Sequence, residues 1–202
     1  MSKIKFTQTE LKKQKDLLRR YNKFLPTLKL KKQQLQATIR ELEEKIDGER
    51  VLLDKLKKEI LIWAGILIVE KTALIPVKQF IEVEKLDIHN ENIAGIDIPV
   101  LDRIIWKTNT FPLLLVKPYT IPASEQLKDY LTRKINVSIL KKQEELLNRE
   151  LRKTTQRVNL FEKVRIPECQ ENIRVIKIYL GDMEVAAVCR AKIAKLKISM
   201  ME

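Results

Sequence analysis

The chain has 202 residues, of which 33% are charged and only 5% are aromatic, and its formal net charge is +13. So many charges with so few aromatic side chains argue against a thick globular core, whereas an apolar content of 45% argues against disorder. With 4 glycines and 7 prolines, the composition is typical of long helices that bury a narrow apolar stripe. We therefore expect an all-α, elongated coiled-coil protein.

The residues that follow Phe6 are mostly polar, and the first residues do not contain the apolar stretch of a signal peptide. We therefore expect a cytoplasmic protein. The strongest apolar run covers residues 60–69, about half of what a helix needs to cross a bilayer. We therefore expect no direct insertion into a membrane.

Residues 1–71 are expected to form the first coiled-coil helix, because apolar residues recur in alternating steps of three and four. Of seventeen seam positions, fourteen are apolar, and the exceptions are Gln14, Lys32 and Glu49. A period of 3.5 residues predicts a left-handed supercoil. Pro26 lies within the pattern and predicts a kink or a short break. The seam positions are 11, 14, 18, 21, 25, 28, 32, 35, 39, 42, 46, 49, 53, 56, 60, 63 and 67.

Residues 72–123 lose the heptad and hold five of the seven prolines, which indicates a small, partly β head. Val77 to Leu86 and Ile93 to Val100 are rich in β-branched residues, and residues 89–92 suit a turn. We expect a small hairpin or two here. Trp63 and Trp106 are interpreted as core residues that pack helix against head.

Residues 124–202 are expected to form the second coiled-coil helix, capped by the hydroxyl of Ser124 and extending to about Lys197. Its seam is offset by one residue at a point beside Pro167, which predicts a local change in winding or a kink. Before the offset the seam residues are Leu140, Leu147, Leu151, Val158 and Phe161, and after it they are Ile166, Cys169, Ile173, Ile176, Leu180, Met183 and Ala187.

Two helices of similar length, each with one apolar stripe, can bury these stripes by folding back on one another. We therefore expect an antiparallel hairpin of helices. A parallel homodimer would also bury the stripes, but it would leave the matched lengths of the two helices without a reason.

Residues for catalysis or for binding a small ligand are missing from the sequence. The four glycines stand alone, so they do not form a phosphate-binding loop. The single histidine, His89, and two cysteines twenty residues apart do not supply a zinc site or a catalytic triad. We expect no catalytic, cofactor or metal site, and no disulfide between Cys169 and Cys189, about 30 Å apart along one helix.

Positive charge is concentrated near the two termini. Residues 1–35 carry eleven Lys or Arg against two acidic residues, and residues 170–202 carry six against four. In an antiparallel hairpin these segments are neighbours and make one basic end. The lysines either merely solubilise the coil or meet nucleic acid, an anionic membrane or an acidic protein cavity. Nucleic acid is disfavoured by the lack of interleaved aromatics, and membrane by the absence of a free apolar stripe.

Several motifs give the chain a resemblance to a known family, the D subunits of V-type ATP synthases, over nearly its whole length. The most specific segment is Arg157-Val158-Asn159 followed, after six further residues, by Ile166-Pro167. The matching residues are Thr7, Leu11, Leu28, Lys29, Lys31, Leu35, residues 92–99, residues 155–162, Ile166, Pro167, Ile173, Ile176, Leu180 and the basic tail at 190–197.

This resemblance implies a central rotor shaft without catalytic activity of its own, which couples ATP synthesis or hydrolysis to ion transport, with the proton expected as the ion. It implies three kinds of partner: the hexamer of catalytic and regulatory subunits, the small F subunit of the stalk, and a cup-shaped subunit above the membrane ring. The hexamer would meet Lys12, Lys13, Arg190, Lys192, Lys195 and Lys197, and the membrane sector would meet Asn92, Gly95 and Pro99. The alternative is a structural coiled-coil adaptor or a nucleic-acid-associated protein that uses the basic end.

Overall fold

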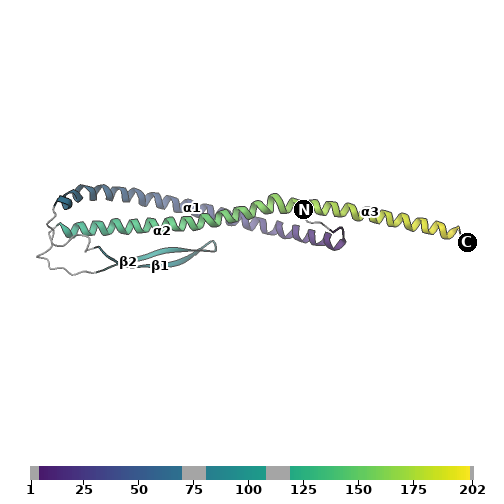
Figure 1. The fold of residues 1–202 in the computed structure, drawn as a ribbon, viewed down its shortest axis with the longest axis horizontal. Helices are drawn as coiled ribbons and strands as arrows, with labels where there is room; N and C mark the ends of the chain where they lie inside the picture. The colour runs from purple at the N-terminus through teal and green to yellow at the C-terminus, as the bar shows by residue number, and fades with distance from the viewer. Residues whose placement is uncertain (1–4, 70–80, 108–118, 201–202) are drawn as a thin grey trace. The chain divides into compact units, whose positions relative to one another are not determined.

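The computed structural model describes residues 5–69, 81–107 and 119–200 (Figure 1). Helix α1 spans Gln8–Val69, strands β1 and β2 span Val83–Ile93 and Ile96–Trp106, and helix α2 spans Thr120–Leu160. A π-helical turn, η3, follows at Phe161–Arg165, and helix α3 spans Ile166–Ser199. The prediction of two long helices with a small β head between them is confirmed. None of the described helices has the length and apolar character needed to cross a membrane.

The chain divides into two compact units that each take residues from both long helical regions. Unit 1 comprises residues 1–32 and 153–202, and unit 2 comprises residues 33–152. Each unit therefore brings together segments that are far apart in the sequence, as a helix that folds back on an earlier one requires.

The heptad pattern of α1 predicts its burial correctly. All sixteen seam positions from Leu11 to Trp63 are buried or half-buried, and the side chain at position 67 lies outside the described residues. Of the kink or short break expected at Pro26, the break is wrong, because α1 is continuous through this residue. Pro26 is exposed, so water can satisfy the carbonyl that the missing N–H leaves free.

Unit 2 contains a hydrophobic core where α1, α2 and the hairpin meet. Leu35 and Leu147 are fully buried, and Ile98 of β2 is only 3% exposed. The helices are antiparallel: Arg133 Nη1 of α2 donates to Glu49 Oε2 of α1 at 3.0 Å, and Trp63 Nε1 donates to Gln126 Oε1 at 2.6 Å. The first of these bonds explains how Glu49 occupies a seam position, because its charge is paired. The core residues are Leu35, Ile39, Leu42, Ile46, Ile98 and Leu147.

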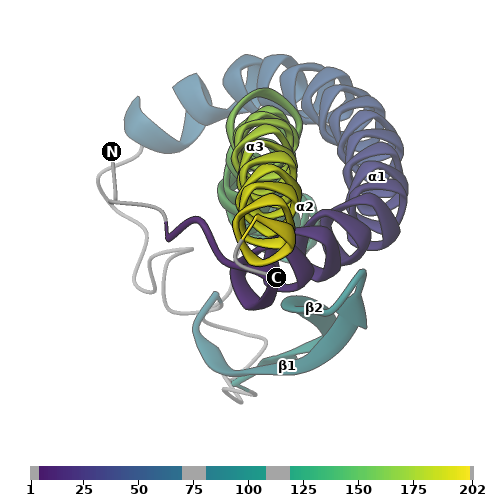
Figure 2. The ribbon, with the colours of Figure 1, turned by 90° about the vertical axis from the view of Figure 1, so that its right-hand side faces the viewer.

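Strands β1 and β2 form an antiparallel hairpin, as Figure 2 shows. The predicted hairpin is confirmed, but the expected turn at residues 89–92 is wrong, because these residues continue β1. The chain reverses at Ala94 and Gly95, which have φ values of 54° and 78°. Two successive positive φ angles match the twist of the flanking strands, and glycine adopts such an angle without strain. Residues 77–80 of the first expected strand lie outside the described residues.

Unit 1 also pairs antiparallel segments. The rings of Phe6 and Tyr179 lie 4.9 Å apart, and those of Tyr21 and Phe161 lie 5.0 Å apart. The side chains buried in this unit include Leu11, Val158, Cys169 and Ile176. The apolar seam therefore continues through this unit as far as Leu180, which is half-buried.

The start of α2 differs from the prediction. The helix begins at Thr120, and Ser124 lies inside it, where its hydroxyl donates to the carbonyl of Ile121 at 2.7 Å. Pro122 falls in the first turn, where a backbone N–H has no helical partner to lose. The proline is therefore tolerated, and the expected cap at Ser124 is wrong.

Candidate partner-binding surfaces

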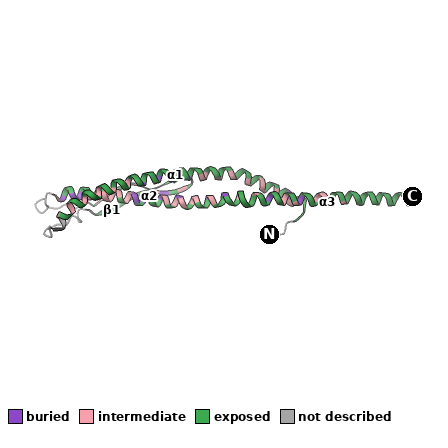
Figure 3. Ribbon diagram, turned by 90° about the horizontal axis from the view of Figure 1, so that it is seen from above, coloured by how far each residue is buried: buried purple, intermediate pink, exposed green. Residues whose placement is uncertain are grey.

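Within the described residues, no helix packs against the last part of α3. From Asp182 to Met200, only Ala186 is even half-buried, and Figure 3 shows this end of α3 exposed on its visible side. Val185 is 65% exposed and Ile198 is 63% exposed. The expected seam burial of Met183 and Ala187 is therefore wrong, because α1 begins at Gln8 and Phe6 already lies beside Tyr179. We call residues 182–199 the terminal segment.

The terminal segment has an apolar stripe with basic flanks. Its exposed residues Val185, Cys189, Ile193 and Leu196 follow one another in steps of four, four and three, which places them on one face of a helix. Arg190 and Lys197 are seven residues apart and share one flank, whereas Lys192 and Lys195 share the other. An exposed stripe of this kind suits a partner with an apolar groove and an acidic rim.

The predicted basic residues fall into two separate groups. Lys12 and Lys13 are exposed on the second turn of α1, and Lys13 Nζ lies 4.0 Å from Glu10 Oε2. Arg190 lies eleven residues beyond Tyr179, the neighbour of Phe6, which is about 16 Å along the helix. The structure therefore does not merge the lysines of α1 with the basic flanks of the terminal segment.

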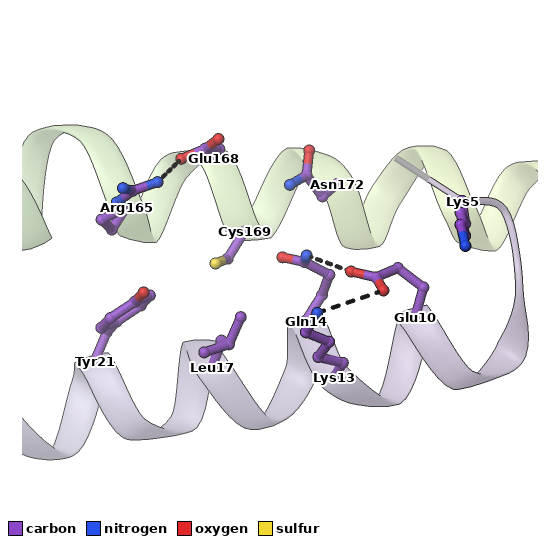
Figure 4. A pocket seen from close by; sticks show the side chains of 10 residues that line it. All are labelled: Lys5, Glu10, Lys13, Gln14, Leu17, Tyr21, Arg165, Glu168, Cys169 and Asn172. Atoms are coloured by element: carbon purple, nitrogen blue, oxygen red, sulfur yellow. Dashed lines mark hydrogen bonds and ion pairs between the residues drawn. The ribbon is translucent and has the colours of Figure 1, made fainter. Parts of the chain in front are cut away.

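A recess lies between α1 and α3 in unit 1, and Figure 4 shows the thiol of Cys169 directed toward it. Its other lining residues include Gln14, whose amide donates to Glu10 Oε1 at 2.9 Å. Burial raises the pKa of the Cys169 thiol, so the sulfur is protonated and a poor nucleophile at neutral pH. Among the described residues, no group of three or more His, Cys, Asp or Glu is placed to hold a metal ion.

Asn92, Gly95 and Pro99 serve the hairpin itself in this structure. The Asn92 side chain accepts a bond from the Gly95 N–H at 3.1 Å and donates to Asp97 Oδ1 at 2.7 Å. The Pro99 carbonyl accepts a bond from Gln143 Nε2 of α2 at 2.5 Å. The tip of the hairpin packs on the core of unit 2, beside Leu35 and Leu147. Contact of these three residues with a partner stays a prediction.

Two residues that dock the hairpin were not identified from the sequence. Gln143 is only 5% exposed, although its side chain is polar. Its position does not interrupt a recognisable pattern in the sequence. Ile98 alternates with Asp97 and Pro99, so it could have been assigned to the buried face of a strand. No local signal in the sequence connects Gln143 to Pro99, which lies 44 residues away.

The fold and the terminal segment define a class of protein: a coiled-coil protein with a docked β-hairpin and a helix end that no described residue covers. A family model that describes the D subunit of ATP synthase matches residues 10–196. The chain belongs to this family.

Named relatives agree with the family match. The chain is 45% identical over 195 residues to the V-type ATP synthase D subunit of Borreliella burgdorferi, covering 96% of this chain and 95% of the relative. It is 31% identical over 201 residues to the D subunit of Chlamydia caviae, covering 98% and 94% of the two chains. It is 30% identical over 197 residues to the D subunit of Chlamydia trachomatis serovar L2, covering 98% and 97%.

Proposed function

We propose that this chain is the non-catalytic rotor shaft of a V-type ATP synthase. In this role it transmits torque between ATP synthesis or hydrolysis in a catalytic hexamer and the transport of ions, expected to be protons, through a membrane ring. Membership of the D subunit family supports the assignment to the complex. The paired antiparallel helices of each unit support a stiff shaft, because two packed helices resist bending and twisting more than one does.

The observation that carries the proposal is the uncovered terminal segment. Its apolar stripe and four basic residues have no partner within the described chain, and such a stripe is stabilised when a partner covers it. We propose that it enters the catalytic hexamer, with Arg190, Lys192, Lys195 and Lys197 facing acidic groups. Lys12 and Lys13 are separate from this group, so they are proposed to form a second contact with the hexamer, away from the terminal segment.

The other partners are assigned to the rest of the chain. The small F subunit of the stalk is proposed to bind alongside the paired helices, and a cup-shaped subunit to receive the other end of the shaft. Asn92, Gly95 and Pro99 are proposed to face the membrane sector through the hairpin that they stabilise. The protein then works in the cytoplasm, at the surface of the membrane, as part of the complex.

A charge-reversal experiment tests the proposal. Replacing Arg190, Lys192, Lys195 and Lys197 by Glu should leave the circular dichroism spectrum unchanged, because all four side chains are exposed. The same variant, reassembled with the other ATPase subunits in vesicles, should lose ATP-driven ion transport. The tail variant should also lose binding to the catalytic hexamer in a pull-down. The matched control reverses four exposed lysines of α1 in unit 2, Lys45, Lys55, Lys57 and Lys58, and should keep this binding, because they lie outside the terminal segment.

Normal transport by the tail variant would overturn the role of the terminal segment. Failure of the wild-type chain to join any ATPase subunit in a pull-down would overturn the proposed function itself. Steep salt-dependent binding of DNA or RNA by such a chain would favour the adaptor alternative.

A further inference from the structure

The π-turn η3 contains one residue more than an α-helical turn. The N–H of Ile166 donates to the carbonyl of Phe161, five residues back, whereas an α-helix would use the carbonyl four residues back. Helices α2 and α3 continue on either side of it without a loop. The second helical region is therefore continuous but holds a single extra residue.

This extra residue lies where the apolar seam changes register. Thr154, Val158 and Phe161 are buried or half-buried and follow in steps of four and three. A regular heptad would place the next seam residue at Arg165, but Arg165 is exposed and Ile166 is half-buried. From Ile166 the steps of three and four resume through Cys169, Ile173, Ile176 and Leu180. Removing one residue between Phe161 and Ile166 would join the two seams into one unbroken heptad.

Contacts with α1 hold the seam on both sides of η3. On the N-terminal side, Val158 is only 4% exposed. At the start of η3, the ring of Tyr21 packs in a tilted orientation against that of Phe161, and Lys29 Nζ donates to Glu162 Oε1 at 2.8 Å. On the other side, Cys169 is 5% exposed and Ile176 is fully buried. An α-helical turn in place of η3 would rotate one of these two stretches by about 100° relative to the other. One stripe would then turn away from α1.

Pro167 offers a competing explanation for the π-turn, because its missing N–H and its ring disrupt an α-helical turn. The chain contains its own control for this idea. Pro26 lies inside α1, which is a continuous α-helix from Gln8 to Val69. A proline within a long helix of this protein is therefore not sufficient to produce a π-turn.

We infer that η3 is a one-residue insertion that keeps the two apolar stripes in phase against α1, and that the seam rather than Pro167 holds it in place. A regular heptad contains no such extra residue, so η3 is a point of altered twist in an otherwise regular helix pair. The interrupted hydrogen-bond ladder makes it the turn of this pair that changes its winding most readily.

Deletion variants of the full chain test the inference by thermal unfolding. Deleting Val164, which is 50% exposed, should give a continuous α-helix with one heptad seam and a Tm at least as high as that of the wild type. The control deletion removes Lys142, an exposed residue of α2 in an unbroken part of the seam. Even if the π-turn became an α-helical turn, this deletion would still shift the seam residues from Leu147 to Phe161 out of register. It should therefore lower the Tm by more than about 10 °C. Equal losses for the two deletions would overturn the inference.

A substitution separates the seam from the proline. In a crystal structure of the Pro167→Ala variant, the bond from the Ile166 N–H to the Phe161 carbonyl should remain, with Cys169 and Ile176 still buried. A regular α-helix through residues 161–165 in that variant would show that Pro167 causes the π-turn, and would overturn the inference. If deletion of Val164 lowers the Tm, the double variant that also carries Pro167→Ala should restore it. A double variant that stays less stable than the wild type would contradict the inference that removing one residue joins the two seams into one unbroken heptad.

Discussion

The core of unit 2 and the terminal segment of α3 have the same kind of helical pattern and opposite environments. Leu35 and Leu147 are fully buried where three elements meet, whereas Leu196, also on an apolar stripe, is 59% exposed. The difference arises from the presence or absence of a helix packed opposite the stripe and not from the stripe itself. Helix α1 begins at Gln8, and no described residue covers α3 beyond Leu180. An apolar stripe thus shows that a helix can be covered by another helix, but that second helix need not belong to the same chain.

The largest effect that separates the two regions is expected from truncating their leucines. Leu35→Ala should lower the free energy of unfolding by about 2–5 kcal/mol, because it removes a fully buried side chain and leaves a cavity. Leu196→Ala should change it by less than about 0.5 kcal/mol, since this side chain contacts mostly water. Urea unfolding followed by circular dichroism measures both values. Similar losses for the two variants would mean that the terminal segment is covered in the free chain.

A smaller effect is expected where the hairpin meets α2. Gln143→Ala removes the donor to the Pro99 carbonyl and should cost about 1–3 kcal/mol, the range for an unsatisfied buried polar group. Gln156→Ala, at an exposed position of the same helix, is the matched control and should be nearly neutral. The same urea titration compares the two. A neutral Gln143→Ala would show that apolar contacts alone dock the hairpin.

The smallest effect concerns the ion pair beside η3. The hydrogen bond from Lys29 lowers the pKa of the Glu162 carboxyl, so the folded state favours its ionised form. This contribution to stability is present above the ordinary pKa of the group and is lost as the pH falls through the lowered value. Lys29→Met should therefore flatten the decline in Tm between about pH 5 and about pH 3. Lys45→Met, on an exposed face of α1, should leave the decline unchanged; equal curves for both would remove Glu162 from the acid response.

Most of the helical fold could be predicted from the sequence because a heptad reports burial directly, as the seam from Leu11 to Trp63 shows. The register offset near Pro167 was also visible in the spacing of Phe161 and Ile166, although spacing alone does not distinguish a π-turn from a kink. The docking of the hairpin could not be predicted, since the bond from Gln143 to Pro99 depends on tertiary contacts. The uncovered terminal segment was missed for a similar reason: a heptad continues through Met183 whether or not a second helix lies opposite.

The terminal segment has a further consequence for the cost of assembly. A helix without tertiary contacts depends on its own residues, and this one contains four alanines, at 186, 187, 191 and 194, with Lys197 favourably placed at its last turn. A disordered tail would have to fold as it bound, and the lost conformational entropy would weaken the complex. A tail that is already helical avoids most of that loss, so a short contact surface would be enough to hold the partner proposed for it.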